Sequence, residues 1–129
     1  MPRKLTTLIV LGALLTSGSL AAHHSTAMFD DKQTVTLTGT IKEFQYTNPH
    51  SWLNIDVTAD DGTVTTWGFE AEGPTTLMRS GIRKSSLPVG TKITITGNPM
   101  KDGRLAAAWI DATLDDGTKI NPRDGFVAR

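Results

Sequence analysis

The chain has 129 residues, in which 13 Lys and Arg balance 13 Asp and Glu, and it has no cysteine. This is the length of one domain, and its zero formal charge argues against a nucleic-acid partner, which requires a basic excess to neutralise phosphates. The lack of cysteine excludes disulfides, thiolate metal sites and a cysteine nucleophile.

Residues 1–22 have the pattern of a secretory signal peptide. Arg3 and Lys4 precede an apolar run over 8–15, and a stretch of small residues follows. The run is shorter than the about 20 residues that a membrane-spanning helix needs. Cleavage can follow Ala21 or Ala22. We therefore expect a periplasmic or secreted mature protein with no membrane span.

An N-terminal arm (23–34) leads into a predicted domain over 35–120. Apolar residues alternate with threonines over 35–41, and this period of two indicates a β-strand. The alternation changes phase before Phe44, which predicts a bulge near Lys42 that curls the strand.

Two more strands are predicted around 53–57 and 67–71, where apolar residues alternate again. The Asp61–Gly62 pair between them is typical of a hairpin turn. The residues that follow predict a two-turn helix, because Pro74 suits a first helical position and Gly81 suits the position after the end.

The last strands are predicted around 93–97 and 105–114, before a loose tail over 121–129. Three strands, a short helix and two more strands follow the order of the OB-fold, a five-stranded, partly open barrel. We therefore predict an all-β, OB-fold-like domain with one short helix. A small β-sandwich is the alternative, and the helix between the third and fourth strands argues against it.

The three histidines fall in two short motifs, His23-His24 at the expected mature N-terminus and Asn48-Pro49-His50 in a turn. Cleavage after Ala22 would free the α-amine of His23, which can chelate one metal together with its own ring while His50 adds a third nitrogen. Cleavage after Ala21 would instead place a histidine third, where the amine, two amides and an imidazole form a square-planar site. Both donor sets suit copper(II), and the square-planar set also suits nickel(II).

The sequence therefore predicts a copper site with His23, His24 and His50 as candidate ligands. The first strand separates the two motifs, so the arm must double back for them to meet. The other interpretation is an arm in solvent and a histidine that serves only the turn. Metal affinity through imidazoles should fall as protons compete at low pH.

Other candidates have more ordinary interpretations. Glu70 and Glu72 lie two apart near a strand end, and we expect a solvated pair of acids. Trp67 and Trp109 are in phase with the core, whereas Trp52 is a candidate for the surface.

The motifs recur in order along nearly the whole mature chain, from Ala22-His23-His24-Ser25 through 47–52, Asp61-Gly62 and 77–81 to 87–90. In this combination the chain resembles a family of small secreted bacterial proteins of unknown function. The resemblance implies an OB-like fold and a Gram-negative envelope location, and it implies no reaction. Ile82 stands where that family usually has Trp, so no aromatic role is carried over to this position.

Three functions stay open on sequence alone. The first is a non-enzymatic, periplasmic protein that binds copper through His23, His24 and His50. The second is a metal-free accessory module that binds an envelope protein or a small ligand. The third is a copper-dependent oxidoreductase with Tyr46 beside an open metal position. Convergence of the two histidine motifs would favour the first and third, and placement at opposite ends of the barrel would favour the second.

Overall fold

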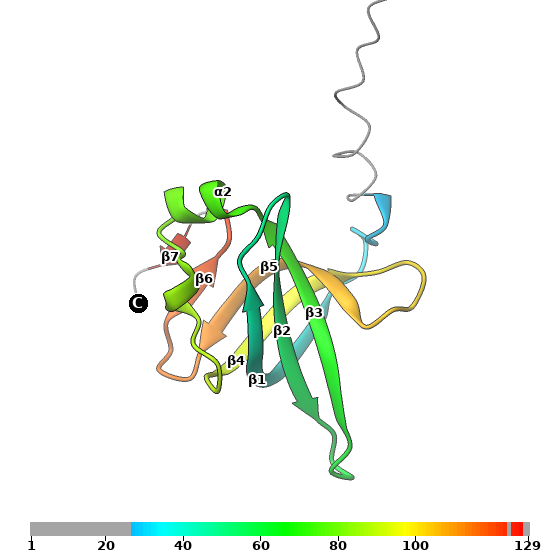
Figure 1. Cartoon of the computed structure of the whole chain (residues 1–129). Helices are drawn as coiled ribbons and strands as arrows, with labels where there is room; N and C mark the ends of the chain where they lie inside the picture. Colours follow the sequence, from blue (N-terminus) through cyan, green and yellow to red (C-terminus); the bar gives the residue numbers. More distant parts are fainter. Residues whose placement is uncertain (1–26, 124, 128–129) are drawn as a thin grey trace, which may run out of the picture.

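The computed structural model describes residues 27–123 and 125–127. Five strands carry the fold (Figure 1), namely β1 (Val35–Gln45), β2 (His50–Thr58), β3 (Val64–Glu72), β4 (Lys92–Pro99) and β5 (Ala106–Leu114). The first three form an antiparallel meander, and β4 and β5 form an antiparallel hairpin.

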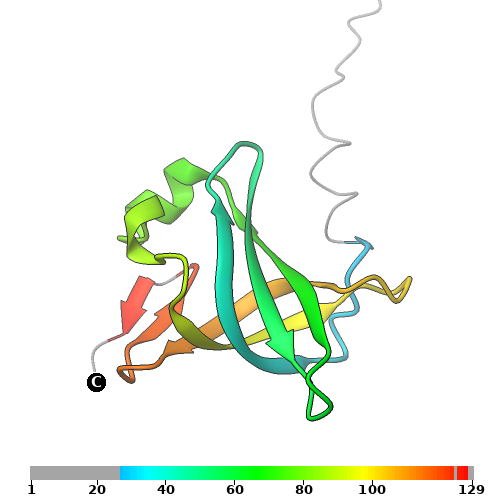
Figure 2. The ribbon, with the colours of Figure 1, turned by 60° about the horizontal axis from the view of Figure 1, so that its bottom comes forward.

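The sheet closes on itself through two further pairings. β1 pairs antiparallel with β4, and β5 runs parallel to β3 over 106–108. Figure 2 shows the resulting barrel, in which the strands of the meander cross those of the β4–β5 hairpin at a steep angle. This strand order, with a helix between β3 and β4, is that of the OB-fold. The predicted fold class is confirmed.

The long first strand serves two neighbours because it bends. Its first half, from Val35 to Thr40, pairs with β4, and its second half pairs with β2. The register shifts between Ile41 and Glu43, which confirms the predicted bulge at Lys42. A bulge inserts one residue and increases the local twist, and this lets one strand leave a partner and join another.

The core consists of the inward-facing residues of all five strands. Its fully buried members include Ile41, Leu53, Ile55, Phe69, Ile93, Ile95 and Ala107. Trp109 is buried and Trp67 is half-buried against the same core, as the strand phase predicts. The ring of Trp52 is half-buried over Gly68, where an added Cβ would lie 3.2 Å from it.

The short helix α2 (Pro74–Arg79) closes one end of the barrel (Figure 1). Pro74 occupies its first turn and Gly81 adopts φ +78°, as predicted. The amide of Ile82 donates to the Leu77 carbonyl at 2.8 Å, and both side chains are fully buried. Buried apolar contacts therefore anchor the helix, since it is too short to be stable alone.

Three smaller elements complete the fold, a 3₁₀ turn η1 (Lys84–Ser86) and the strands β6 (Lys119–Asn121) and β7 (Gly125–Val127). β6 pairs with β5, and β7 pairs with β6. The prediction of a loose tail over 121–129 is therefore wrong for Gly125–Val127, which form β7. The helices within the described part of the chain are all too short or too polar to cross a membrane. The predicted signal peptide lies outside the described residues.

The second bulge of the barrel makes Gly97 intolerant of a side chain. An added Cβ would lie 2.6 Å from the Ala108 carbonyl oxygen and 2.9 Å from the Ala107 Cβ. We expect Gly97→Ala to lower the free energy of unfolding by about 1–3 kcal/mol through overpacking. Urea denaturation would measure this, with Thr65→Ala on the exposed face of β3 as the control. Equal midpoints for Gly97→Ala and the wild type would contradict this packing.

Candidate functional site

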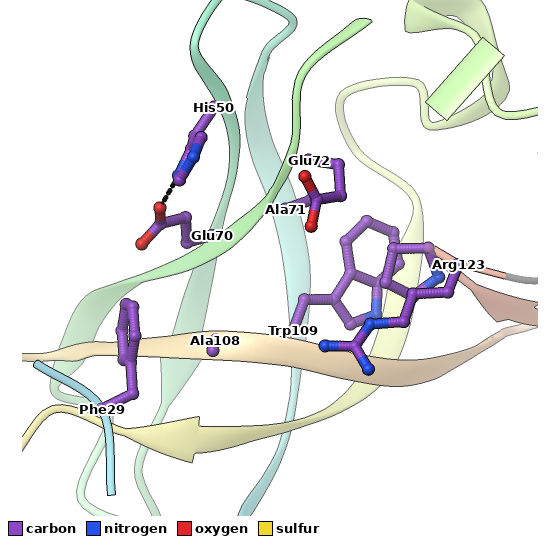
Figure 3. A pocket seen from close by; sticks show the side chains of 9 residues that line it. Phe29, His50, Glu70, Ala71, Glu72, Ala108, Trp109 and Arg123 are labelled. Atoms are coloured by element: carbon purple, nitrogen blue, oxygen red, sulfur yellow. Dashed lines mark hydrogen bonds and ion pairs between the residues drawn. The ribbon is translucent and has the colours of Figure 1, made fainter. Parts of the chain in front are cut away.

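The site begins with an imidazole and a carboxylate on neighbouring strands. His50 is the first residue of β2, and in the register it lies opposite Glu72 and diagonal to Glu70. Its Nδ1 hydrogen-bonds to the Glu70 Oε1 (Figure 3). Diagonal neighbours on one face of an antiparallel pair are within reach of long side chains. The hairpin register alone therefore brings these two groups together.

Glu70 is a buried residue, which corrects the expected solvated pair of acids. Its side chain is 8% exposed, whereas that of His50 is 30% exposed and Glu72 lies at the surface. Glu70 points away from the core residue Phe69, because successive strand residues face opposite sides. It is nevertheless buried at the point where β3 pairs with β5, and it lines one recess together with Phe29 of the N-terminal arm.

The arm is held in place by backbone hydrogen bonds. The amide of Lys101 donates to the Met28 carbonyl at 2.9 Å, and the amide of Asp30 donates to the Pro99 carbonyl at 2.8 Å. Phe29 forms an isolated bridge with Met100 between these bonds and is itself buried. The arm therefore adds a short strand to the end of β4 and carries an aromatic ring to the site.

A cavity of about 100 Å³ lies between these elements, half open to solvent. Figure 3 shows His50, Glu70 and Phe29 on one side of it and Glu72, Trp109 and Arg123 on the other. Ala71, Ala108 and Pro122 complete its lining. The cavity opens where β3 leaves β5, since the parallel pairing of these strands stops at Glu70 and Ala108.

Two buried polar atoms in this lining have no hydrogen-bond partner among the described residues. They are the Glu70 Oε2 and the Trp109 Nε1. An unpaired buried donor or acceptor costs free energy, and most such groups in native proteins are paired. Both residues line this cavity, and each leaves one polar atom without a partner from the described residues.

The hydrogen bond to Glu70 also sets the chemistry of His50. With its Nδ1–H directed at the carboxylate, the imidazole keeps the Nε2 lone pair available. Histidine ligands of metals are oriented in this way, by a carboxylate or carbonyl on the other ring nitrogen. In residues 27–123 and 125–127, no three His, Cys, Asp or Glu side chains are grouped so that they could hold a metal ion. A metal at His50 thus requires donors from outside this range.

The other candidate residues have different outcomes. His23 and His24 lie outside the described residues. The Tyr46 hydroxyl lies within hydrogen-bonding distance of the Pro74 and Ile82 carbonyls, at 3.0 and 2.9 Å. Tyr46 therefore fastens the ends of α2 to β1, and this engagement argues against the expected role beside a metal. Glu70 is the residue that sequence reasoning placed in the wrong environment.

The fold and the cavity together define a small OB-fold protein with a histidine–carboxylate pair in a lined recess. The model of the Family of unknown function (DUF6152) matches residues 13–112, and the chain belongs to this family. Comparisons with curated proteins and with solved structures found no match. The matched segment includes His50, Glu70 and Trp109, and the family description assigns them no function.

The hydrogen bond from His50 to Glu70 has a direct spectroscopic consequence. We expect the neutral imidazole of His50 to carry its proton on Nδ1 in the wild type. Glu70→Leu, which removes the acceptor, should lose this preference. Long-range proton–nitrogen NMR spectra distinguish the two tautomers, and His50→Ala assigns the signals. Glu72→Gln is the matched control, because Glu72 is exposed and makes no such bond. A wild-type ring protonated mainly on Nε2 would contradict the assignment.

Proposed function

We propose that this protein is a non-enzymatic, periplasmic copper-binding protein that acts after removal of residues 1–22. The proposed ligands are His23, His24 and His50. The observation that carries the proposal is the contact of His50 with the buried Glu70, which leaves the Nε2 free to bind a metal. An oriented imidazole is the arrangement that metal sites require of their histidine ligands.

The position of the arm supports a shared site. Phe29 lines the same cavity as His50, and His24 and His23 precede it by five and six residues. An extended chain covers about 3.3–3.6 Å per residue, so these histidines can reach about 17–22 Å from Phe29. The arm does not reverse along β1, since Phe29 pairs antiparallel with Met100 and Val35 with Gly97 in the same direction along β4. Closure of the barrel between β5 and β3 brings this end of β4 toward Glu70.

The donor set supports copper over lighter divalent metals. An α-amine and imidazoles are nitrogen donors, and affinity for such sites rises along the first-row metals to copper(II). Magnesium and calcium prefer oxygen ligands. Since bound nitrogens must be deprotonated, copper affinity should fall as the pH is lowered. The envelope location is part of the same proposal, because cleavage by signal peptidase creates the free amine.

The decisive experiment begins with the mature protein isolated from the periplasm, whose intact mass gives the cleavage site. We expect one copper(II) to bind, and His50→Ala to weaken it at least about tenfold through loss of one imidazole ligand. Titration of both proteins, followed by the copper absorption and spin-resonance spectra, measures this. Gln45→Ala, an exposed change near the same turn, should leave the affinity unchanged.

Two results would count against this function. Equal copper affinity in the wild type and His50→Ala would remove His50 from the site and leave only chelation by the chain terminus. No uptake of copper by correctly trimmed protein would reject metal binding altogether. The accessory module that binds a partner or a small ligand would then be the function to pursue.

A further inference from the structure

The carboxylate of Glu70 has two accepting oxygens, and the described residues engage only one of them. Its Oε1 is bound by the Nδ1 of His50, whereas its Oε2 is buried and has no partner in residues 27–123 and 125–127. The side chain is 8% exposed, and a buried acceptor left unpaired costs free energy. A donor for Oε2 has to come from elsewhere, either from solvent or from the chain before residue 27.

The N-terminal arm is the segment that arrives at this carboxylate. Phe29 lines the same cavity as Glu70 and His50, and Figure 3 shows the three side chains on one side of it. The bridge from Phe29 to Met100 fixes the arm at this place. His24 precedes Phe29 by five residues, and such a stretch spans at most about 18 Å. Because Phe29 and Glu70 line one small cavity, a histidine of the arm can reach Oε2.

The chemistry of a copper ligand decides which donor of the arm suits Oε2. An amine must lose its proton to bind a metal, so an ammonium that donates to Glu70 is lost as a ligand. An imidazole has two nitrogens, and it can donate with one while the other binds the metal.

His24 has this capacity with either site of signal-peptide cleavage. If cleavage follows Ala22, the amine and ring of His23 form the chelate, and the ring of His24 is free to donate with one nitrogen. If cleavage follows Ala21, His24 is the third residue, and it binds the metal through one ring nitrogen and keeps the N–H of the other.

We propose that Glu70 bridges two imidazoles, with His50 donating to its Oε1 and His24 donating to its Oε2. This bridge fastens the arm to the barrel before a metal is bound and leaves one nitrogen of each ring available. Glu70 is therefore a positioning residue for two ligands at once. The inference rests on the proposed function for the role of both histidines as ligands, but the contact itself belongs to the metal-free protein and is tested there.

The first test uses NMR of the mature protein freed of metal by a chelator. We expect a ring N–H signal of His24 that is protected from exchange with water, and His24→Ala assigns it. Glu70→Gln should abolish this protection, because an amide keeps only one accepting oxygen for two imidazoles. Glu72→Gln, an exposed change on the same strand, is the matched control and should keep the signal.

The second test measures the coupling of His24 with Glu70 through urea unfolding of the metal-free protein. His24 belongs to none of the described strands, so its replacement leaves the barrel in place. We expect His24→Ala to lower the midpoint of unfolding and His24→Gln, which keeps a side-chain N–H donor, to restore most of the loss. In the Glu70→Gln background, His24→Ala should have a much smaller effect. Ser25→Ala, the neighbouring change in the arm, should leave the midpoint unchanged.

The third test returns to the metal. We expect Glu70→Gln to weaken copper(II) binding by about tenfold to a hundredfold, as loss of a carboxylate behind a histidine ligand does. Glu72→Gln should bind copper as the wild type does.

Three outcomes would overturn the bridge. The first is a His24 ring that exchanges its proton in the wild type as fast as in Glu70→Gln, which would assign water to Oε2. The second is an equal midpoint for the metal-free wild type and His24→Ala. The third is protection of the His23 ring in place of the His24 ring. Copper binding by a protein with an unprotected His24 would reject the bridge alone, whereas a protected His24 without copper uptake would reject only the proposed function.

Discussion

The buried carboxylate of Glu70 is the constraint on which the site depends. A charged group removed from water costs several kcal/mol unless it is paired and hydrogen-bonded. The structure pairs one of its oxygens with His50 and leaves the other without a hydrogen-bond partner among the described residues. Outward-facing residues of a strand are usually solvated, so the burial of Glu70 is a feature of this one position. Glu70 lies at the end of the β3–β5 pairing, in a recess that Phe29 of the arm also lines.

The barrel geometry explains why the recess lies where it does. From Gly68 to Glu70, β3 has two neighbours, since β2 flanks one edge and β5 the other. Beyond this residue β3 continues with β2 alone, while β5 turns toward β6. Two strands that diverge from a shared pairing leave a gap, and the cavity beside His50 lies there. The ends of paired strands in an OB-fold are thus natural places for binding, and here one end also carries the only histidine of the barrel.

Local patterns predicted the barrel well because local physics determines it. Alternating residues over 35–41 gave the first strand, the change of phase at Phe44 gave the bulge, and Pro74 with Gly81 gave the helix. Each depends on a preference that acts within a few residues. The last strand, β7, escaped prediction because three residues are too few to show a period, and its stability comes from pairing with β6.

The site was less accessible to such reasoning because it depends on contacts between distant segments. His50 stood out as one of three histidines. Counting residues along the β2–β3 hairpin places Glu72 opposite His50, and Glu70, two residues earlier, lies on the same face. That count cannot reveal that Phe29 lines the same cavity, because Phe29 is held there by a bridge to Met100, 71 residues later in the chain. Trp109 was placed in the core correctly, yet its unpaired N–H is visible only in three dimensions.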